Sequence, residues 1–191
     1  MKLHASSSLA LVAAIASFTR SASADTGLMV ETDPSTFFLG GFAAHARVAL
    51  EGGHVTVGGG LYALTFPSFL VDLNPNDRGA GWNVRLELGG AIFGDYYFGG
   101  NAQGWFVGAE AALQRYRYTN DDVAGQARAT NFVFLPRAGY QWRPLDAGFY
   151  VMPWVGLGYE VQIGGSRQIG NRTYDLSPLV PYAAVHVGWR F

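Results

Sequence analysis

The residues of this chain best suited to chemistry are charged side chains. They occupy every second position in segments where polar and apolar residues alternate. They are Arg47, Arg85, Glu87, Glu110, Arg137, Glu160, His186 and Arg190. Successive side chains of a strand point to opposite faces, so we expect this set on one common face. Buried charges need partners, and the signs predict a Glu110–Arg137 ion pair. They also predict a second cluster of Arg85, Glu87 and Glu160.

Such a set could form a structural network of ion pairs, an ion path or gate, or a pair of catalytic carboxylates. We favour the structural network, because opposite charges that share a buried face satisfy one another. Nothing near the carboxylates suggests the geometry of a substrate site.

The histidines and serines show no pattern of a nucleophilic site. Beyond residue 24 they are His45, His54, His186, Ser35, Ser68, Ser166 and Ser177. None lies in a Gly-x-Ser-x-Gly or His-x-Ser arrangement. Ser177 and His186 share one segment but lie about 30 Å apart along a strand, far beyond hydrogen-bond reach. The chain has no cysteine, which excludes disulfides and thiolate zinc sites. We therefore expect no catalytic residue, no metal site and no cofactor.

The segment 177–191 shows which elements position the charged groups. Its apolar row is Leu179, Pro181, Ala183, Val185, Val187, Trp189 and Phe191, and the alternate row contains His186 and Arg190. In a soluble protein the apolar row would pack on a core, but no helix is expected to cover it. The pattern predicts a barrel strand with lipid outside and polar groups inside.

Similar segments precede it along the chain. They are 36–50, 54–70, 82–98, 104–118, 130–142 and 148–163, with 26–32 as a short further candidate. In 82–98 the predicted outward row contains Val84, Leu86, Leu88 and Ile92, which places Arg85 and Glu87 inward. Single-chain bacterial barrels have even strand numbers. We therefore predict an all-β fold, an eight-stranded antiparallel up-and-down transmembrane β-barrel. A soluble sandwich and a lipocalin-like barrel are the alternatives.

Composition agrees with strands that face lipid. Charged residues make up 14% of the chain, below the usual figure of about 25%, and glycine is abundant, with 26 residues. The formal net charge of -1 gives no indication of nucleic-acid binding. Beyond residue 24, no run of 18 apolar residues predicts a spanning helix. A barrel also satisfies every backbone polar group within lipid.

The first residues have the layout of a secretory signal peptide. Lys2 and His4 precede the apolar run 9–18, and Ala22-Ser23-Ala24 is a small-x-small cleavage site. The run is too short to span about 30 Å of hydrocarbon. We predict a cleaved signal peptide over 1–24 and a barrel domain over 25–191, exported to the outer membrane of a Gram-negative bacterium.

Loop lengths orient the predicted barrel. Short connections lie at 51–53, 99–103 and 143–147, and longer ones lie at 71–81, 119–129 and 164–176. Outer-membrane barrels have short periplasmic turns and longer outer loops. Aromatic residues gather near both ends of the strands, as rings favour membrane interfaces.

The chain resembles the small bacterial outer-membrane barrels of the OmpA/OmpX-like superfamily. The resemblance rests on the succession of hairpins, the aromatic girdles, the signal peptide and the terminal Phe191. The resemblance is architectural and covers about 25–191. The stretches 136–142 and 153–159 resemble strands of uncharacterised barrel families. The spacing of Val185, Val187, Trp189 and Phe191 is similar to the signal that the barrel-assembly machinery reads. The resemblance implies that machinery, outer-membrane lipid and lipopolysaccharide as partners.

These features predict a non-enzymatic barrel with a structural or surface-interaction role through its longer loops. A narrow pore or transporter for small solutes is the alternative. Met152, Trp154, Leu135 and Tyr182 argue against the continuous wet lumen that a pore needs. A lipid-modifying enzyme, a less favoured alternative, would need a serine and a histidine in contact at the membrane rim.

Overall fold

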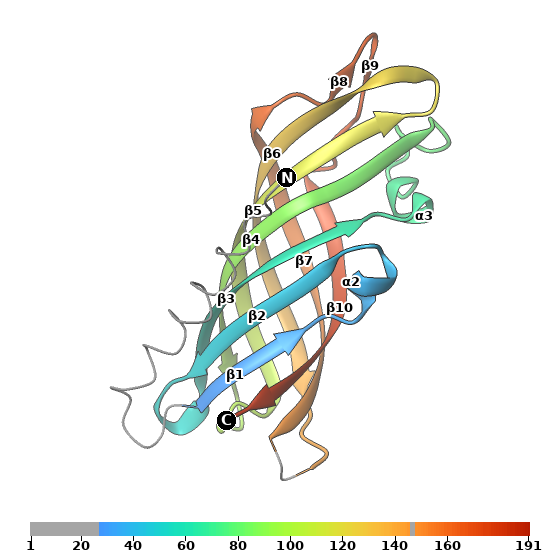
Figure 1. Ribbon diagram of the computed structural model, residues 1–191. Helices are drawn as coiled ribbons and strands as arrows, with labels where there is room; N and C mark the ends of the chain where they lie inside the picture. Colours follow the sequence, from blue (N-terminus) through green and yellow to red (C-terminus); the bar gives the residue numbers. More distant parts are fainter. Residues whose placement is uncertain (1–26, 146–147) are drawn as a thin grey trace, which may run out of the picture.

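The computed structural model describes residues 27–145 and 148–191. Eight strands form a closed antiparallel barrel in the order β1-β10-β7-β6-β5-β4-β3-β2 (Figure 1). Their bounds are β1 Gly27–Thr32, β2 Phe42–Ala49, β3 Val55–Thr65, β4 Trp82–Tyr97, β5 Gly104–Asn120, β6 Val123–Gln141, β7 Phe149–Gly165 and β10 Leu179–Arg190. The predicted all-β, eight-stranded, up-and-down architecture is confirmed. The predicted signal peptide, residues 1–24, lies outside the described residues.

Short elements lie in the connections. They are α2 (Ser35–Phe38), η2 (Glu51–Gly53), α3 (Ser68–Val71) and the small hairpin of β8 (Gln168–Ile169) and β9 (Arg172–Thr173). Within the described ranges, none of the helices is long and apolar enough to cross a bilayer. The end of the barrel with η2 and the turn 98–103 is called the turn end, and the end with α3, β8 and β9 is called the loop end.

The short first strand closes the barrel. Met29 pairs with Arg190 of β10 on one side and with Arg47 of β2 on the other. The Phe191 backbone N–H also donates to the Leu28 carbonyl, at 2.9 Å. Residues 27–32 of the candidate segment 26–32 therefore form the strand that removes both free edges of the sheet.

Three predictions of where strands begin and end were wrong. Residues 35–38 form α2, so β2 begins only at Phe42. β3 ends at Thr65, just before Pro67, which cannot donate to a ladder. The predicted loop 119–129 is mostly strand, because β5 and β6 continue almost to a two-residue turn.

A β-bulge at Glu87 changes which side chains of β4 point inward in the part of the strand nearer the loop end. The pairing of β4 with β5 shifts between Leu86 and Leu88, so Glu87 is an extra residue on the β4 side. Beyond it, Val84 and Leu86 point inward, with 4% and 1% of their surface exposed. Arg85 and Glu87 therefore lie on the outer face, and their predicted place on the inward row is wrong.

The outer face of the barrel is apolar over most of its height. From Asn131 to Gln141 of β6, every second side chain is exposed and the residues between are buried. The exposed large apolar side chains of the wall include Ile92, Trp105, Val107, Leu113, Phe134, Val155, Leu157, Tyr159 and Val185. A large apolar surface that continues from strand to strand is typical of a face that contacts lipid or a partner.

Side chains fill the interior in two layers. The layer at the loop end is apolar and aromatic, and contains Val71, Trp82, Val84, Leu86, Tyr116, Tyr118, Ala127, Ala129 and Ile169. The layer toward the turn end includes Met29, Tyr97, Phe106, Val133, Leu135, Tyr150, Met152 and Trp154. Small barrels of this strand number have room for packed side chains and little else.

Candidate functional site

A chain of alternating charges crosses the inside of the barrel. Arg47 pairs with Glu31, and its Nη1 lies 2.9 Å from Asp95 Oδ2. Arg137 donates from Nη2 to the same Asp95 oxygen at 2.9 Å and from Nε to Oδ1 at 3.0 Å. Its Nη1 lies 3.2 Å from Glu110 Oε2, so the predicted Glu110–Arg137 pair forms. Asp95 is thus the centre of a series of five charges that alternate in sign.

Each residue of this series comes from a different strand. Glu31 lies on β1, Arg47 on β2, Asp95 on β4, Glu110 on β5 and Arg137 on β6. The side chains of all but Glu110 are fully buried, and Glu110 is 11% exposed. Removal from water makes such charges costly unless every one is paired, which explains their arrangement.

Two glycines of the wall make room for the charged side chains, and an aromatic ring packs against the guanidinium groups. A Cβ added to Gly58 would lie 2.7 Å from the Arg47 Cβ, and one added to Gly108 would collide with the Asp95 carboxylate. The Phe93 ring packs against both cations, with its centroid 5.0 Å from Arg47 Cζ and 4.6 Å from Arg137 Cζ. Cation–π contact is favourable for both groups, whose side chains are buried.

Tyrosine hydroxyls complete the network toward the turn end. Tyr97 accepts from Arg47 at 3.2 Å and donates to Gln141 Oε1 at 2.7 Å. Tyr150 donates to Glu31 Oε2 at 2.7 Å. Both carboxylate oxygens of Glu31 are therefore occupied within the barrel.

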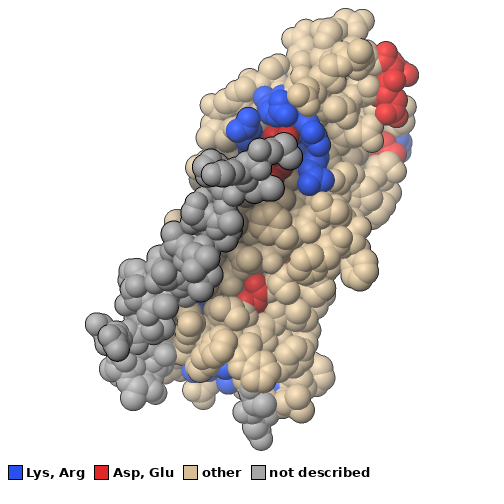
Figure 2. All heavy atoms as spheres, viewed as in Figure 1, with Lys and Arg blue, Asp and Glu red and all other residues tan. Residues whose placement is uncertain are grey.

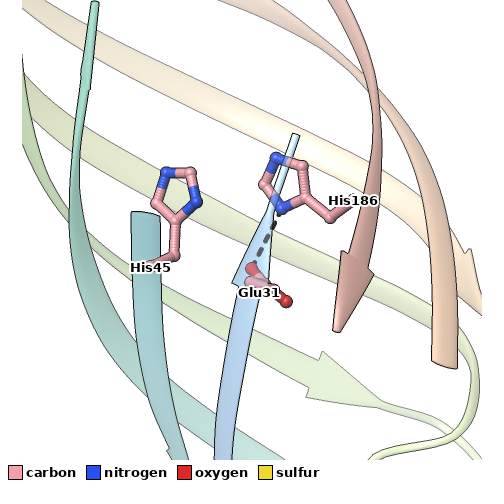
Figure 3. Close-up of side chains that lie close together, drawn as sticks. All are labelled: Glu31, His45 and His186. Atoms are coloured by element: carbon pink, nitrogen blue, oxygen red, sulfur yellow. Dashed lines mark hydrogen bonds and ion pairs between the residues drawn. The ribbon is translucent and has the colours of Figure 1, made fainter. Parts of the chain in front are cut away.

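Two histidines meet beside Glu31 (Figure 3). His186 Nδ1 lies 2.9 Å from Glu31 Oε1, and Trp154 donates to His186 Nε2 at 3.2 Å. These partners assign the proton of His186 to Nδ1. The ring of His45 stacks on that of His186 with centroids 4.9 Å apart.

The ligand atoms of Glu31, His45 and His186 lie within 4.8 Å of one another, so a metal ion must be considered. A metal needs a free lone pair from each ligand. The single lone pair of His186 accepts from Trp154, and the Glu31 carboxylate already neutralises Arg47. This donor set fits a hydrogen-bonded network better than a cation site.

The remaining predicted site residues lie apart from this network. Glu160 is buried at another height, where it accepts from Asn131 Nδ2 at 2.6 Å. Arg190 lies at the turn end and donates to the Asn101 carbonyl at 2.7 Å. The predicted cluster of Arg85, Glu87 and Glu160 does not form, because the bulge places the first two outside.

The connections at the loop end are tied into a cap. Asp77 accepts from the backbone N–H of Asp175 at 3.1 Å, and Arg172 pairs with Asp122 at 2.8 Å. The ring of Tyr174 packs against Tyr118, with centroids 4.9 Å apart. Burial raises the pKa of the Asp77 carboxyl, and it raises the pKa of Tyr174 to about 12. The cap is therefore a defined surface joined by contacts between connections far apart in the sequence.

Two solved structures are similar to this chain. One is the N-terminal β-barrel domain of Pseudomonas aeruginosa OprF, with a TM-score of 0.49, 14% identity, and coverage of 87% of this chain and 96% of that one. The other is a major outer membrane protein from Thermus thermophilus, with a TM-score of 0.47, 16% identity, and coverage of 87% of this chain and 99% of that one. No protein-family model matches the chain, and no curated protein matches it in sequence.

Proposed function

We propose that this chain is a non-enzymatic transmembrane barrel of the bacterial outer membrane, with a closed interior and a structural or surface-interaction role. The observation that carries the proposal is the inverted polarity of the barrel. Arg47, Asp95 and Arg137 are buried inside, while Ile92 and Trp105 are exposed outside by 71% and 67%. A soluble sandwich or lipocalin-like barrel would bury the second kind of residue and expose the first.

The first test is quenching of tryptophan fluorescence by lipids brominated on the acyl chains. In single-tryptophan variants of the barrel refolded into such vesicles, we expect strong quenching of Trp105 and weak quenching of Trp154. Trp105 lies on the outer face and Trp154 is 8% exposed inside. Equal quenching of both, or of neither, would contradict a barrel that spans lipid with this face outward.

The filled interior favours a structural role over a pore. Leu135 and Met152 are 2% and 0% exposed, and the charges near them are paired with one another. Ion conduction needs a wet path with sites that ions can leave. These contacts leave the charged groups no freedom to solvate a passing ion.

We therefore expect the refolded barrel to be silent in planar-bilayer conductance. Heat-modifiable gel mobility of the same sample is the control for folding. Stable single-channel steps would reverse the order of the two hypotheses and would make the narrow pore the better one.

The geometry also disfavours the enzyme hypothesis. The Ser177 hydroxyl donates to the Leu179 carbonyl at 2.8 Å, and both His186 nitrogens are engaged elsewhere. Nucleophilic catalysis needs a serine and its base within hydrogen-bond reach. Interaction through the cap is therefore the better-supported route to a surface function. Within this proposal, Val185, Val187, Trp189 and Phe191 form the signal that the assembly machinery recognises.

A further inference from the structure

Four arginines gather on the outer face near the loop end. This arginine patch consists of Arg85 on β4, Arg115 and Arg117 on β5, and Arg128 on β6. Figure 2 shows an arc of blue beside a red group there, on a face whose other coloured atoms are mostly tan. Arg85 pairs in register with Arg117, and Arg117 pairs in register with Arg128. Three like charges thus lie directly opposite one another across three strands.

Among the described residues, one carboxylate forms ion pairs with this patch. Glu87 lies 3.1 Å from Arg128, 3.6 Å from Arg117 and 3.7 Å from Arg115. Arg85 contacts only neutral acceptors among the described residues, with Thr65 Oγ1 at 2.7 Å and the Gly40 carbonyl at 3.4 Å. Like charges directly opposite across strands are destabilising. The arrangement therefore favours an additional negative charge from outside the chain.

A small cavity lies between two of these arginines. It has a volume of about 160 Å³ and is lined by Thr65, Asn83, Val84, Arg85, Arg117 and Thr119. The guanidinium and hydroxyl groups supply donors, whereas the Asn83 amide already donates to Asp121 Oδ1 at 2.8 Å. A guanidinium fork matches the oxygens of a phosphate group in two parallel hydrogen bonds. The cavity thus offers donors of the kind that a phosphate accepts.

The height of the patch places it at the rim of the apolar band. The outward row of β5 runs from Trp105 to Leu113 and becomes basic at Arg115. The rise from Gly104 to Arg115 is about 37 Å along a strand of ~3.4 Å per residue. A strand tilt of ~40° reduces this to about 29 Å, close to the ~25 Å of a barrel's apolar band.

Exposed aromatic side chains lie at the same height on the barrel as the arginine patch. Phe38 is 90% exposed and lies two positions before Gly40, whose carbonyl contacts Arg85. Phe42, the first residue of β2, is 42% exposed. Aromatic rings favour the interface between hydrocarbon and headgroups.

We infer that the arginine patch binds the phosphate of a lipid headgroup in the outer leaflet. The inference rests on the proposed membrane location and adds a ligand class and a site to it. The apolar wall below the patch would contact the acyl chains, while the guanidinium groups neutralise the phosphate. A free phosphate ion would bind the arginines without contacting the apolar wall. The test therefore also measures whether inorganic phosphate displaces the lipid.

The test measures the lipid that the barrel retains, by native mass spectrometry after refolding into phosphatidylcholine vesicles containing phosphatidic acid. We expect wild-type barrel to retain phosphatidic acid and the double variant Arg85→Gln/Arg117→Gln to lose most of it. Arg78→Gln is the matched control, because Arg78 lies in a loop-end connection outside the patch. Equal retention by the wild type and the double variant would overturn the site, and so would displacement of the lipid by inorganic phosphate.

A second measurement separates binding from a folding defect. In pure phosphatidylcholine the double variant should unfold at a urea concentration equal to or above that of the wild type, since repulsion between opposed arginines is removed. With phosphatidic acid present, only the wild type and Arg78→Gln should gain stability. No differential gain would overturn the inference. Failure of the membrane proposal itself would appear instead as absent quenching of Trp105 in every variant.

Discussion

Asp95→Asn lowers the free energy of unfolding of the barrel by about 3–5 kcal/mol, the cost of removing one partner from a buried ion pair. Asp95 accepts from both Arg47 and Arg137 and is fully buried. The substitution keeps the shape of the side chain but leaves two guanidinium groups near one another without the charge between them. Urea unfolding in detergent, followed by tryptophan fluorescence, measures the change.

The matched control is Glu87→Gln, because Glu87 lies on the same strand but faces outward. Its ion pairs are partly exposed, and exposed pairs contribute about 0–1 kcal/mol. We therefore expect a small change for Glu87→Gln and a large one for Asp95→Asn. Similar midpoints for the two variants would mean that the interior charges are hydrated, and a closed lumen would no longer be tenable.

The pair of variants also tests the bulge, which sequence alternation could not reveal. A bulge adds one residue to one strand, and only the pairing with the neighbouring strand shows it. Alternation within 82–98 therefore assigned Arg85 and Glu87 to the wrong face. In β6 and β7 the polarity alternates along most of the strand, and the predicted faces are confirmed.

The interior network was predictable only in part for a related reason. Glu110 and Arg137 lie on adjacent strands, Gly108 is the register partner of Arg137, and the hairpin fixes their relative height. Glu31 and His186 are brought together by the closure of β1 on β10, which no local pattern encodes. Asp95 lay on the predicted inward row, but its central place depends on which heights meet across the barrel.

The connection 119–129 shows a further limit of prediction from sequence, because it contains more strand than its composition predicts. Residues 119–129 are polar, and polarity predicts a loop. The structure instead extends β5 and β6, because the inward side chains Tyr118, Ala127 and Ala129 pack into the layer at the loop end. Tertiary packing overrides local composition when one face of a hairpin is buried.

The second large effect is expected for Phe191→Ser in living cells, where most of the folded barrel should disappear from the outer membrane. Phe191 is 73% exposed on the apolar side of the barrel, so its side chain adds little to packing. The substitution keeps the backbone N–H that bonds to the Leu28 carbonyl. In detergent the purified variant should therefore unfold within about 0.5 kcal/mol of the wild type, as surface substitutions usually do.

Leu179→Ser is the control that distinguishes a recognition signal from general loss of apolar surface. Leu179 lies on the same row of β10 and is 54% exposed, but at the opposite end of the strand. We expect it to reach the outer membrane at near wild-type amounts, measured by fractionation and heat-modifiable mobility. Equal losses for both variants would assign the effect to lipid contact along β10. Normal amounts of folded Phe191→Ser would remove the assembly signal from this strand.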